Sequence, residues 1–193
     1  STLAKAGDEV TLTITANEAI SQPTVIFNSG NTSVTNSTIY SGSGTTWTAK
    51  YTVHTNDTDG NVTITVTATD LAGNSTTSTS IASGSVTVDT TAPVLSSVSS
   101  IGTTTDTTPN LTFSTTETGT LTTSISQGFS SGSTVSITSI GSNTITFATL
   151  SNATYSGKTI TLTDGVGNVS NILTIPTFII AANPYASTDI QHW

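Results

Sequence analysis

The 193-residue sequence contains no cysteine, no methionine and no arginine, and only three lysines. Without cysteine the chain can form no disulfide, no thiolate metal site and no cysteine nucleophile. The formal net charge of −8 at pH 7 argues against nucleic acid and anionic membranes as partners, because a phosphate backbone requires a basic patch. The same charge favours divalent cations as partners.

Long hydrophobic runs are also missing. A membrane-spanning helix needs about 18 consecutive apolar residues, and the most apolar segment, residues 172–182, is interrupted by Thr174, Pro176 and Thr177. We therefore predict no membrane insertion. The N-terminus lacks a basic region followed by an apolar one, so we expect any secretion signal to lie outside this chain.

Hydroxyl side chains dominate what is present, with 48 Thr and 29 Ser, and 33% of the residues are hydrophobic. Thr alternates with apolar residues around Leu12 and again around Ile64. A period of two predicts strands with one buried face, and no window has a helical period. The strands predicted in this way cover residues 10–16, 24–27, 33–40, 47–53, 62–68, 85–88, 94–101, 111–114, 120–125, 135–140, 144–147, 159–162 and 173–180.

An internal repeat organises these strands. Residues 69–74 (TDLAGN) match residues 163–168 (TDGVGN), and each copy follows the penultimate strand of its half. A boundary falls at residues 89–93 (DTTAP), where Pro93 begins the next segment with a fixed φ and no amide hydrogen. We predict domain 1 at residues 1–89, domain 2 at residues 90–182, and a C-terminal tail without repeat character at residues 183–193.

These motifs, together with residues 5–8 (KAGD) and 143–147 (NTITF), resemble the tandem bacterial Ig-like repeats of large secreted surface proteins and adhesins. The resemblance extends to about residue 180. It implies a surface location, Ig-like architecture and, in many members, calcium at the linker. We therefore predict an all-β chain of two tandem Ig-like antiparallel β-sandwiches. The first sandwich lacks its first strand, because nothing comparable to residues 93–101 precedes residues 5–8.

Carboxylates gather where loops of the two domains would meet. Loops of a seven-strand sandwich alternate between its two ends, which predicts six acids near the junction: Asp8, Asp57, Asp59, Asp89, Glu117 and Asp164. A hard cation with about 6–8 oxygen ligands relieves repulsion in such a cluster, so we predict Ca²⁺ there, centred on Asp89. The alternative is that these acids are turn residues that bind their own backbone, especially Asp70 and Asp164.

A catalytic role is disfavoured. Residues 128–132 (GFSSG) match the Gly-x-Ser-x-Gly pattern of esterases, but the strand-to-helix turn that this pattern requires is not predicted. His54 lies in the other domain and His192 in the tail, so no Ser/His/Asp arrangement can be proposed. We predict that the chain is not an enzyme and has no catalytic residues.

The leading hypothesis is a non-enzymatic extracellular module, which acts as a spacer or distal segment of a cell-surface adhesin and contacts neighbouring Ig-like domains. An alternative is a subunit of an extracellular filament or S-layer-like lattice, in which identical subunits exchange strands and residues 183–193 are a candidate donor. A third is a glycan-binding module that uses loops of domain 2 with Tyr185 and Trp193. A surface glycan or a protein receptor is therefore a further candidate partner.

Overall fold

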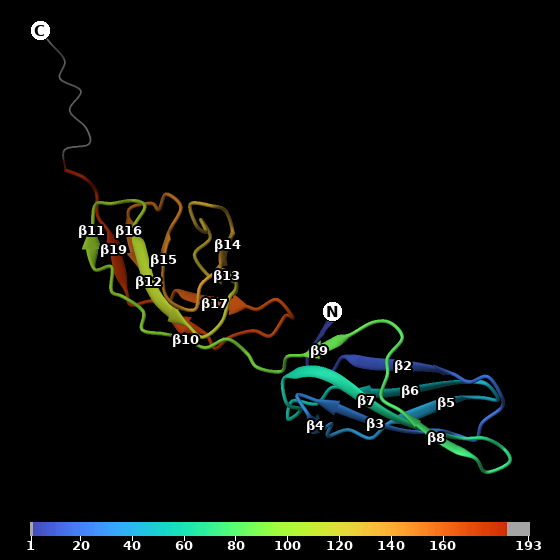
Figure 1. Ribbon diagram of the computed structural model, residues 1–193. Coiled ribbons are helices and arrows are strands. Elements are labelled where there is room, and N and C mark those ends of the chain that lie inside the picture. The colour runs from blue at the N-terminus through green and yellow to red at the C-terminus, as the bar shows by residue number, and fades with distance from the viewer. Residues whose placement is uncertain (1, 185–193) are drawn as a thin grey trace, which may run out of the picture. The chain divides into compact units, whose positions relative to one another are not determined.

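The computed structural model describes residues 2–184, and every regular element among them is a β-strand (Figure 1). The predicted all-β class is confirmed. The chain divides into two compact units between Thr91 and Ala92, called domain 1 and domain 2 below. Tyr185, Trp193 and most of the predicted tail lie outside the described residues.

Domain 1 is a sandwich of two sheets. One sheet has the order β1 (Thr2–Ala4), β9 (Val86–Val88), β7 (Gly60–Thr69), β3 (Thr24–Ser29) and β4 (Thr32–Ser33), and β8 (Ser75–Ser78) also pairs with β7. The other has the order β2 (Glu9–Thr15), β6 (Thr46–Thr52) and β5 (Ile39–Ser43). All pairs are antiparallel except β1 with β9, which run parallel.

The core of domain 1 lies between these sheets and follows the alternation in the sequence. Val10 and Tyr51 come from one sheet, and Phe27 and Ile64 from the other; all four are buried. The rings of Phe27 and Tyr51 pack with their centroids 4.9 Å apart. Strands β2, β3, β6 and β7, which supply these four residues, therefore turn one apolar face toward the core.

Domain 2 has three smaller sheets. The first has the order β10 (Leu95–Ser96), β12 (Asn110–Thr115) and β15 (Gly141–Thr146). The second has the order β14 (Thr134–Ile137), β13 (Gly119–Thr123), β17 (Thr159–Thr163) and β18 (Leu173–Thr174). The third has the order β11 (Thr103–Thr104), β19 (Phe178–Ile180) and β16 (Ala153–Tyr155). The only parallel pair described in this domain is β11 with β19. It corresponds to β1 with β9 in domain 1, so the two domains share this feature of their plan.

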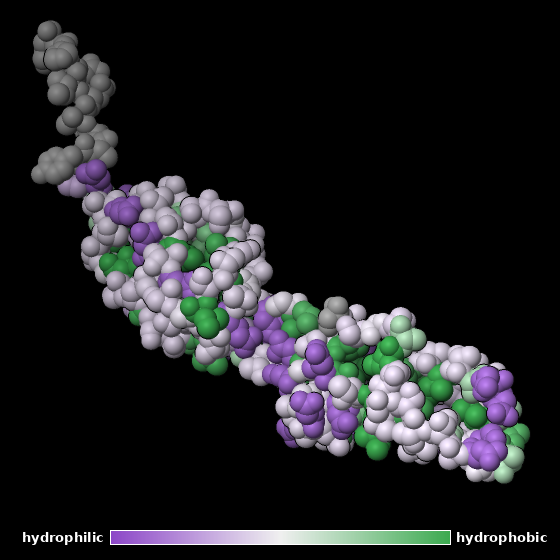
Figure 2. Space-filling model, viewed as in Figure 1, coloured by the Kyte–Doolittle hydropathy of each residue, from purple (hydrophilic) through white to green (hydrophobic). Residues whose placement is uncertain are grey.

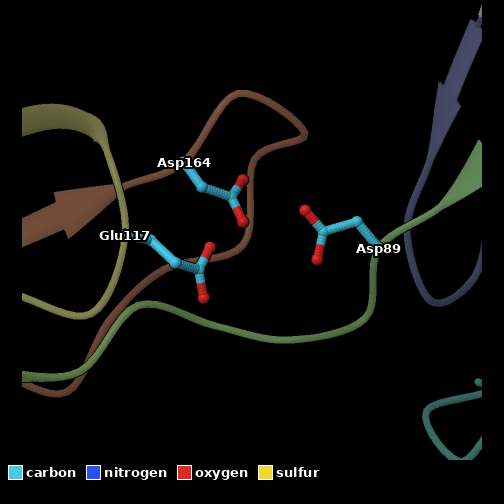
Figure 3. Close-up of side chains that lie close together, drawn as sticks. All are labelled: Asp89, Glu117 and Asp164. Atoms are coloured by element: carbon cyan, nitrogen blue, oxygen red, sulfur yellow. The ribbon is translucent and has the colours of Figure 1, made fainter. Parts of the chain in front are cut away.

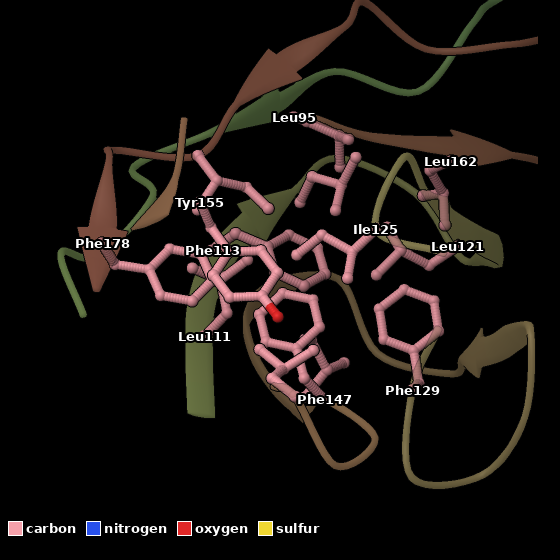
Figure 4. Packing of buried hydrophobic residues seen from close by; sticks show 14 of the residues in the cluster. Leu95, Leu111, Phe113, Leu121, Ile125, Phe129, Phe147, Tyr155, Leu162 and Phe178 are labelled. Carbon is pink, nitrogen blue, oxygen red and sulfur yellow. The ribbon is translucent and has the colours of Figure 1, made fainter. Parts of the chain in front are cut away.

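All three sheets of domain 2 contribute to one core, in which aromatic rings follow one another (Figure 4). Phe129, Phe147, Phe178 and Tyr155 stack in sequence, with centroid distances of 5.9, 6.3 and 4.9 Å. Phe113 is buried beside them. The described part of domain 2 contains no Trp, and Phe side chains supply most of the aromatic rings of its core.

Several strands differ from the sequence prediction. The segment 94–101 forms only the two-residue strand β10, and the segment 173–180 divides into β18 and β19, with Pro176 between them. Strands β1, β8, β11 and β16 were not predicted, because they are short and have little or no alternation. In particular, β1 pairs with β9, although the sequence suggested almost no structure before Lys5.

The cores of the two domains differ in whether the hydroxyl of a buried tyrosine has a hydrogen-bond partner. The Tyr51 hydroxyl is buried and has no hydrogen-bond partner among the described residues, whereas the Tyr155 hydroxyl donates to the Ser151 carbonyl at 3.1 Å. Burial, helped by the negative charge of Asp57, raises the pKa of Tyr51 to about 12. The Tyr51 hydroxyl therefore stays protonated and unsatisfied at neutral pH.

We expect Tyr51→Phe to stabilise domain 1 by about 1 kcal/mol, because it removes a buried polar group without a partner. Tyr155→Phe, the matched control in domain 2, should instead destabilise that domain by about 1 kcal/mol, since it removes a satisfied hydroxyl. Differential scanning calorimetry of the two variants measures both changes. Destabilisation by Tyr51→Phe would show that its hydroxyl has a partner.

Candidate functional site

Asp57 is a buried carboxylate that binds main-chain donors of its own domain. Its Oδ1 accepts the Thr35 N–H at 2.7 Å, and its Oδ2 accepts the His54 N–H at 2.9 Å. Burial acts to raise the pKa of Asp57, but these hydrogen bonds and the nearby His54 outweigh it and lower the pKa below its ordinary value. Asp57 thus ties the loop between β4 and β5 to the loop between β6 and β7.

Asp59 binds the last residues of domain 1. Its Oδ1 accepts the N–H of Thr90 at 2.6 Å and the Thr90 hydroxyl at 2.9 Å, and its Oδ2 accepts the Thr91 hydroxyl. Burial acts to raise the pKa of Asp59, and these bonds overcome it, so the pKa is lowered. Both residues therefore have their carboxylate oxygens engaged by protein donors.

Asp8 and Asp89 lie in the same half of the domain. The Oδ2 of Asp8 accepts the Lys5 N–H at 2.9 Å in the turn between β1 and β2. Asp89 follows β9; its N–H donates to the Ala4 carbonyl, and its Oδ1 accepts the Thr91 N–H at 3.2 Å. Thus the four predicted acids of domain 1 cluster in turns around the ends of β1, β6 and β9.

Glu117 and Asp164, the two predicted acids of domain 2, lie close together. Each places a carboxylate oxygen within 4.8 Å of the other's, and both side chains are half-buried (Figure 3). The register explains this proximity, because Thr120 of β13 pairs with Thr163 of β17, which brings the turn before β13 beside the turn after β17.

Gly119 permits that approach. A Cβ at this position would collide with the Thr163 carbonyl oxygen and lie 3.1 Å from the Asp164 Cα. Only glycine fits there without moving one of the two turns. The pair of carboxylates therefore depends on Gly119, the first residue of β13, which follows the turn that carries Glu117.

Asp164 also organises its own turn. Its Oδ1 accepts the N–H groups of Val166, Gly167 and Asn168 at 2.7–2.9 Å, and its Oδ2 accepts the Asn168 side-chain amide at 2.9 Å. Gly167 has a φ of 95°, a conformation that favours glycine. The turn role considered for Asp164 is therefore present.

Domain 1 contains the same turn. Asp70 accepts the N–H groups of Ala72 and Asn74 at 2.8 Å and the Asn74 side-chain amide at 2.7 Å. These bonds, the side chain of Asn74 first, lower the pKa of Asp70. Gly73 has a φ of 96°. The repeated Asp-x-x-Gly-Asn motif therefore encodes one turn in both domains.

The esterase-like segment 128–132 forms a turn between β13 and β14 and leads into no helix. Phe129 is buried in the core, and its N–H donates to the Gly132 carbonyl at 2.7 Å. His54 belongs to domain 1, where its Nδ1 accepts the Asn56 N–H. The described residues 2–184 contain no helix that is long and apolar enough to cross a membrane.

Comparison of the sequence with protein families finds no match, and comparison with curated proteins finds none either. Solved structures do show likeness. A C-terminal fragment of intimin, bound to the intimin-binding domain of its translocated receptor, has 12% identity and a TM-score of 0.46; the alignment covers 92% of this chain and 62% of the fragment.

Two further structures are similar over most of this chain. A 1.5-MDa bacterial ice-binding adhesin has 16% identity and a TM-score of 0.35, with 90% of this chain and 60% of that one covered. The SGBP-B protein of Bacteroides ovatus, in complex with a mixed-linkage heptasaccharide, has 21% identity and a TM-score of 0.30, with 93% and 44% covered. Because every one of these TM-scores is below 0.5, none of the similarities assigns a function to this chain.

The hydrogen bonds to Asp57 should make domain 1 sensitive to acid. A lowered pKa in the folded state stabilises the fold at every pH above the unfolded value of about 3.9, and this contribution is lost as the pH falls through the folded pKa. We expect Asp57→Asn to lower the free energy of unfolding by roughly 2 kcal/mol at neutral pH, with a smaller difference as the pH falls through the lowered pKa of the folded state.

Urea unfolding of domain 1, followed by Trp47 fluorescence in a Trp193→Phe background, measures this effect. Glu9→Gln is the control, because Glu9 forms an exposed ion pair with Lys50 at 3.1 Å, and such pairs contribute less than about 1 kcal/mol. An effect of Asp57→Asn that does not depend on pH would contradict the assignment.

Proposed function

We propose that this chain is a non-enzymatic structural and adhesion module of an extracellular surface protein, in which two Ig-like sandwiches form a spacer. Each domain has its own core and its own copy of the Asp-x-x-Gly-Asn turn, as expected for units of a repeated array. The exposed faces of the strands are rich in Thr, and only 7% of the residues are charged.

The observation that carries this proposal is the pairing of terminal strands. In domain 1 the first described strand, β1, pairs in parallel with the last, β9, over three residues. In domain 2, β11 pairs in the same way with the last strand, β19. Tension between the two ends of either domain loads these hydrogen bonds in shear, so that several must break together. A spacer that holds a cell against flow needs this resistance.

We expect Ala4→Pro to lower the force that unfolds domain 1, because the register makes the Ala4 N–H a donor to β9 and proline has no N–H. Leu3→Pro is the matched control, since the Leu3 N–H points away from β9 in a parallel ladder. Single-molecule force spectroscopy of the whole chain should show a lower unfolding force for Ala4→Pro only. Equal unfolding forces for the two variants would show that the hydrogen bonds between β1 and β9 do not resist tension.

Calcium is the second part of the proposal. The neighbouring carboxylates of Glu117 and Asp164 offer oxygen ligands to a hard cation, which usually takes about 6–8 of them. Val94 lies five residues after Asp89 and exchanges two hydrogen bonds with Thr116, the neighbour of Glu117. The participation of Asp89, Asp8, Asp57 and Asp59 stays a prediction from the sequence; Asp57 and Asp59 already bind protein donors.

Isothermal titration calorimetry with CaCl₂ tests this part. We expect a dissociation constant in the range of about 10⁻⁴–10⁻³ M, typical of extracellular modules, which Glu117→Gln weakens by about tenfold or more. Glu18→Gln is the matched control, because Glu18 occupies the repeat position of Glu117 in domain 1. Asp89→Asn shows whether Asp89 contributes. Absence of binding at millimolar calcium would contradict the calcium proposal but would not affect the spacer proposal.

A further inference from the structure

The segment 94–101, near the start of domain 2, covers one side of that domain's core and is called the strap below. Its regular pairing is short, because β10 pairs with β12 over only two residues. Leu95 is 2% exposed and belongs to the core (Figure 4), and Val98 and Ile101 pack against the same core. The strap is therefore held on its inner side by apolar contact.

The ladder between the strap and β12 is interrupted at Ser97. Ser96 pairs with Ser114, whereas the Ser99 N–H donates to the Thr112 carbonyl at 2.7 Å. Between these two contacts the strap has one residue more than β12, which makes a β-bulge. Ser97 has a φ of 53°, a left-handed conformation that is strained for residues other than glycine. The bulge limits the regular pairing of the strap to β10.

The side chain of Asn171 takes the place of a neighbouring strand on the other edge of β10. The Thr116 N–H donates to the Val94 carbonyl, so the N–H and C=O groups of Leu95 point away from β12. The Oδ1 of Asn171 accepts the Leu95 N–H at 2.8 Å, and its Nδ2 donates to the Leu95 carbonyl at 3.0 Å. One amide group therefore satisfies both backbone groups of Leu95.

The backbone of Asn171 is fixed to the opposite sheet. Its neighbour Ser170 is buried; the Ser170 N–H donates to the Leu162 carbonyl at 2.8 Å, and the Leu162 N–H donates to the Ser170 Oγ at 2.9 Å. The Ser170 hydroxyl donates to the Asn171 carbonyl at 2.8 Å. Because β17, which contains Leu162, and β10 belong to different sheets, these bonds connect one sheet to the strap on the other.

Ion pairs do not contribute to this attachment, because the strap has no charged residue. Figure 2 shows the visible face of domain 2 mainly in the pale colours of residues with near-neutral hydropathy, such as Ser and Thr. Apolar burial and hydrogen bonds must therefore hold the strap. Among the hydrogen bonds, the two from Asn171 are the ones that join it to the second sheet.

We propose that Asn171 is the clasp of the strap. Its amide keeps residues 94–101 on the core, and when its two bonds break, the strap opens as one unit before the rest of domain 2 unfolds, as locally unfolding segments do. A consequence for tension rests on the proposed spacer function: a pull on the N-terminal end of domain 2 reaches β10 before it reaches the pair of β11 and β19. Asn171 then sets the first barrier that this domain presents to tension.

Native-state hydrogen exchange of the 193-residue chain tests the clasp without tension. Asn171→Asp keeps the size and one acceptor but replaces the donor with a carboxylate oxygen that faces the Leu95 carbonyl. We expect the Leu95 amide to exchange about tenfold faster or more, and the Ser99 amide with it, while the Leu121 amide of β13 is unchanged. Asn152→Asp is the matched control, because it adds the same charge at an exposed position of the same domain.

Asn171→Ala removes both bonds without adding a charge and should accelerate the same two amides, Leu95 and Ser99. Unchanged exchange in this variant, or equal acceleration by Asn152→Asp, would overturn the clasp, because charge alone would then explain Asn171→Asp. Acceleration of Leu95 without Ser99 would show that the strap does not open as a unit. Equal acceleration of Leu121 would show that the whole domain opens. Either result overturns the proposal.

Single-molecule force spectroscopy tests the consequence for tension. In the whole chain, Asn171→Asp should lower the force of the first extension step of domain 2 and leave the unfolding force of domain 1 unchanged. An unchanged first step would overturn the role of Asn171 under tension. The exchange experiment decides the clasp whether or not the chain is a spacer, and failure of the Ala4→Pro prediction would contradict the spacer proposal alone.

Discussion

One-sided burial of short strands holds both domains together. The chain has no cysteine for disulfides, and the described ion pair is the exposed one between Lys50 and Glu9, so stability must come chiefly from apolar area removed from water. Alternation of Thr with Val, Ile and Leu places that area on one face of each strand.

The few acidic residues mostly stabilise backbone geometry. Asp57, Asp59 and Asp70 each accept two or more main-chain or hydroxyl donors, which is why their pKa values are lowered. In a fold built from turns, unpaired N–H groups outside the ladders need acceptors, and a carboxylate serves several at once. Glu117 and Asp164 differ, because they bring two carboxylates to one place, which costs repulsion unless a cation lies between them.

The sequence predicted those features that depend on local patterns. Alternation located β2, β6 and β7, and the repeated motif located the turns of Asp70 and Asp164, because period and turn chemistry are properties of neighbouring residues. Strand β8, which is exposed throughout and rich in hydroxyl side chains, was missed because its pairing with β7 decides its conformation. Asp59 accepts hydrogen bonds from Thr90 and Thr91, which lie about thirty residues away in the sequence. No local pattern could therefore reveal these partners.

The two domains differ in how completely their matching strands are covered. Both sandwiches have the same turn and the same parallel pair of strands, so neither needs the strand 94–101 in order to define its plan. Yet the segment 94–101 covers Leu111 and Phe113 in domain 2, whereas the matching Leu12 and Ile14 in domain 1 are only partly buried. Exposed strand edges are normally shielded, because they invite pairing with other chains.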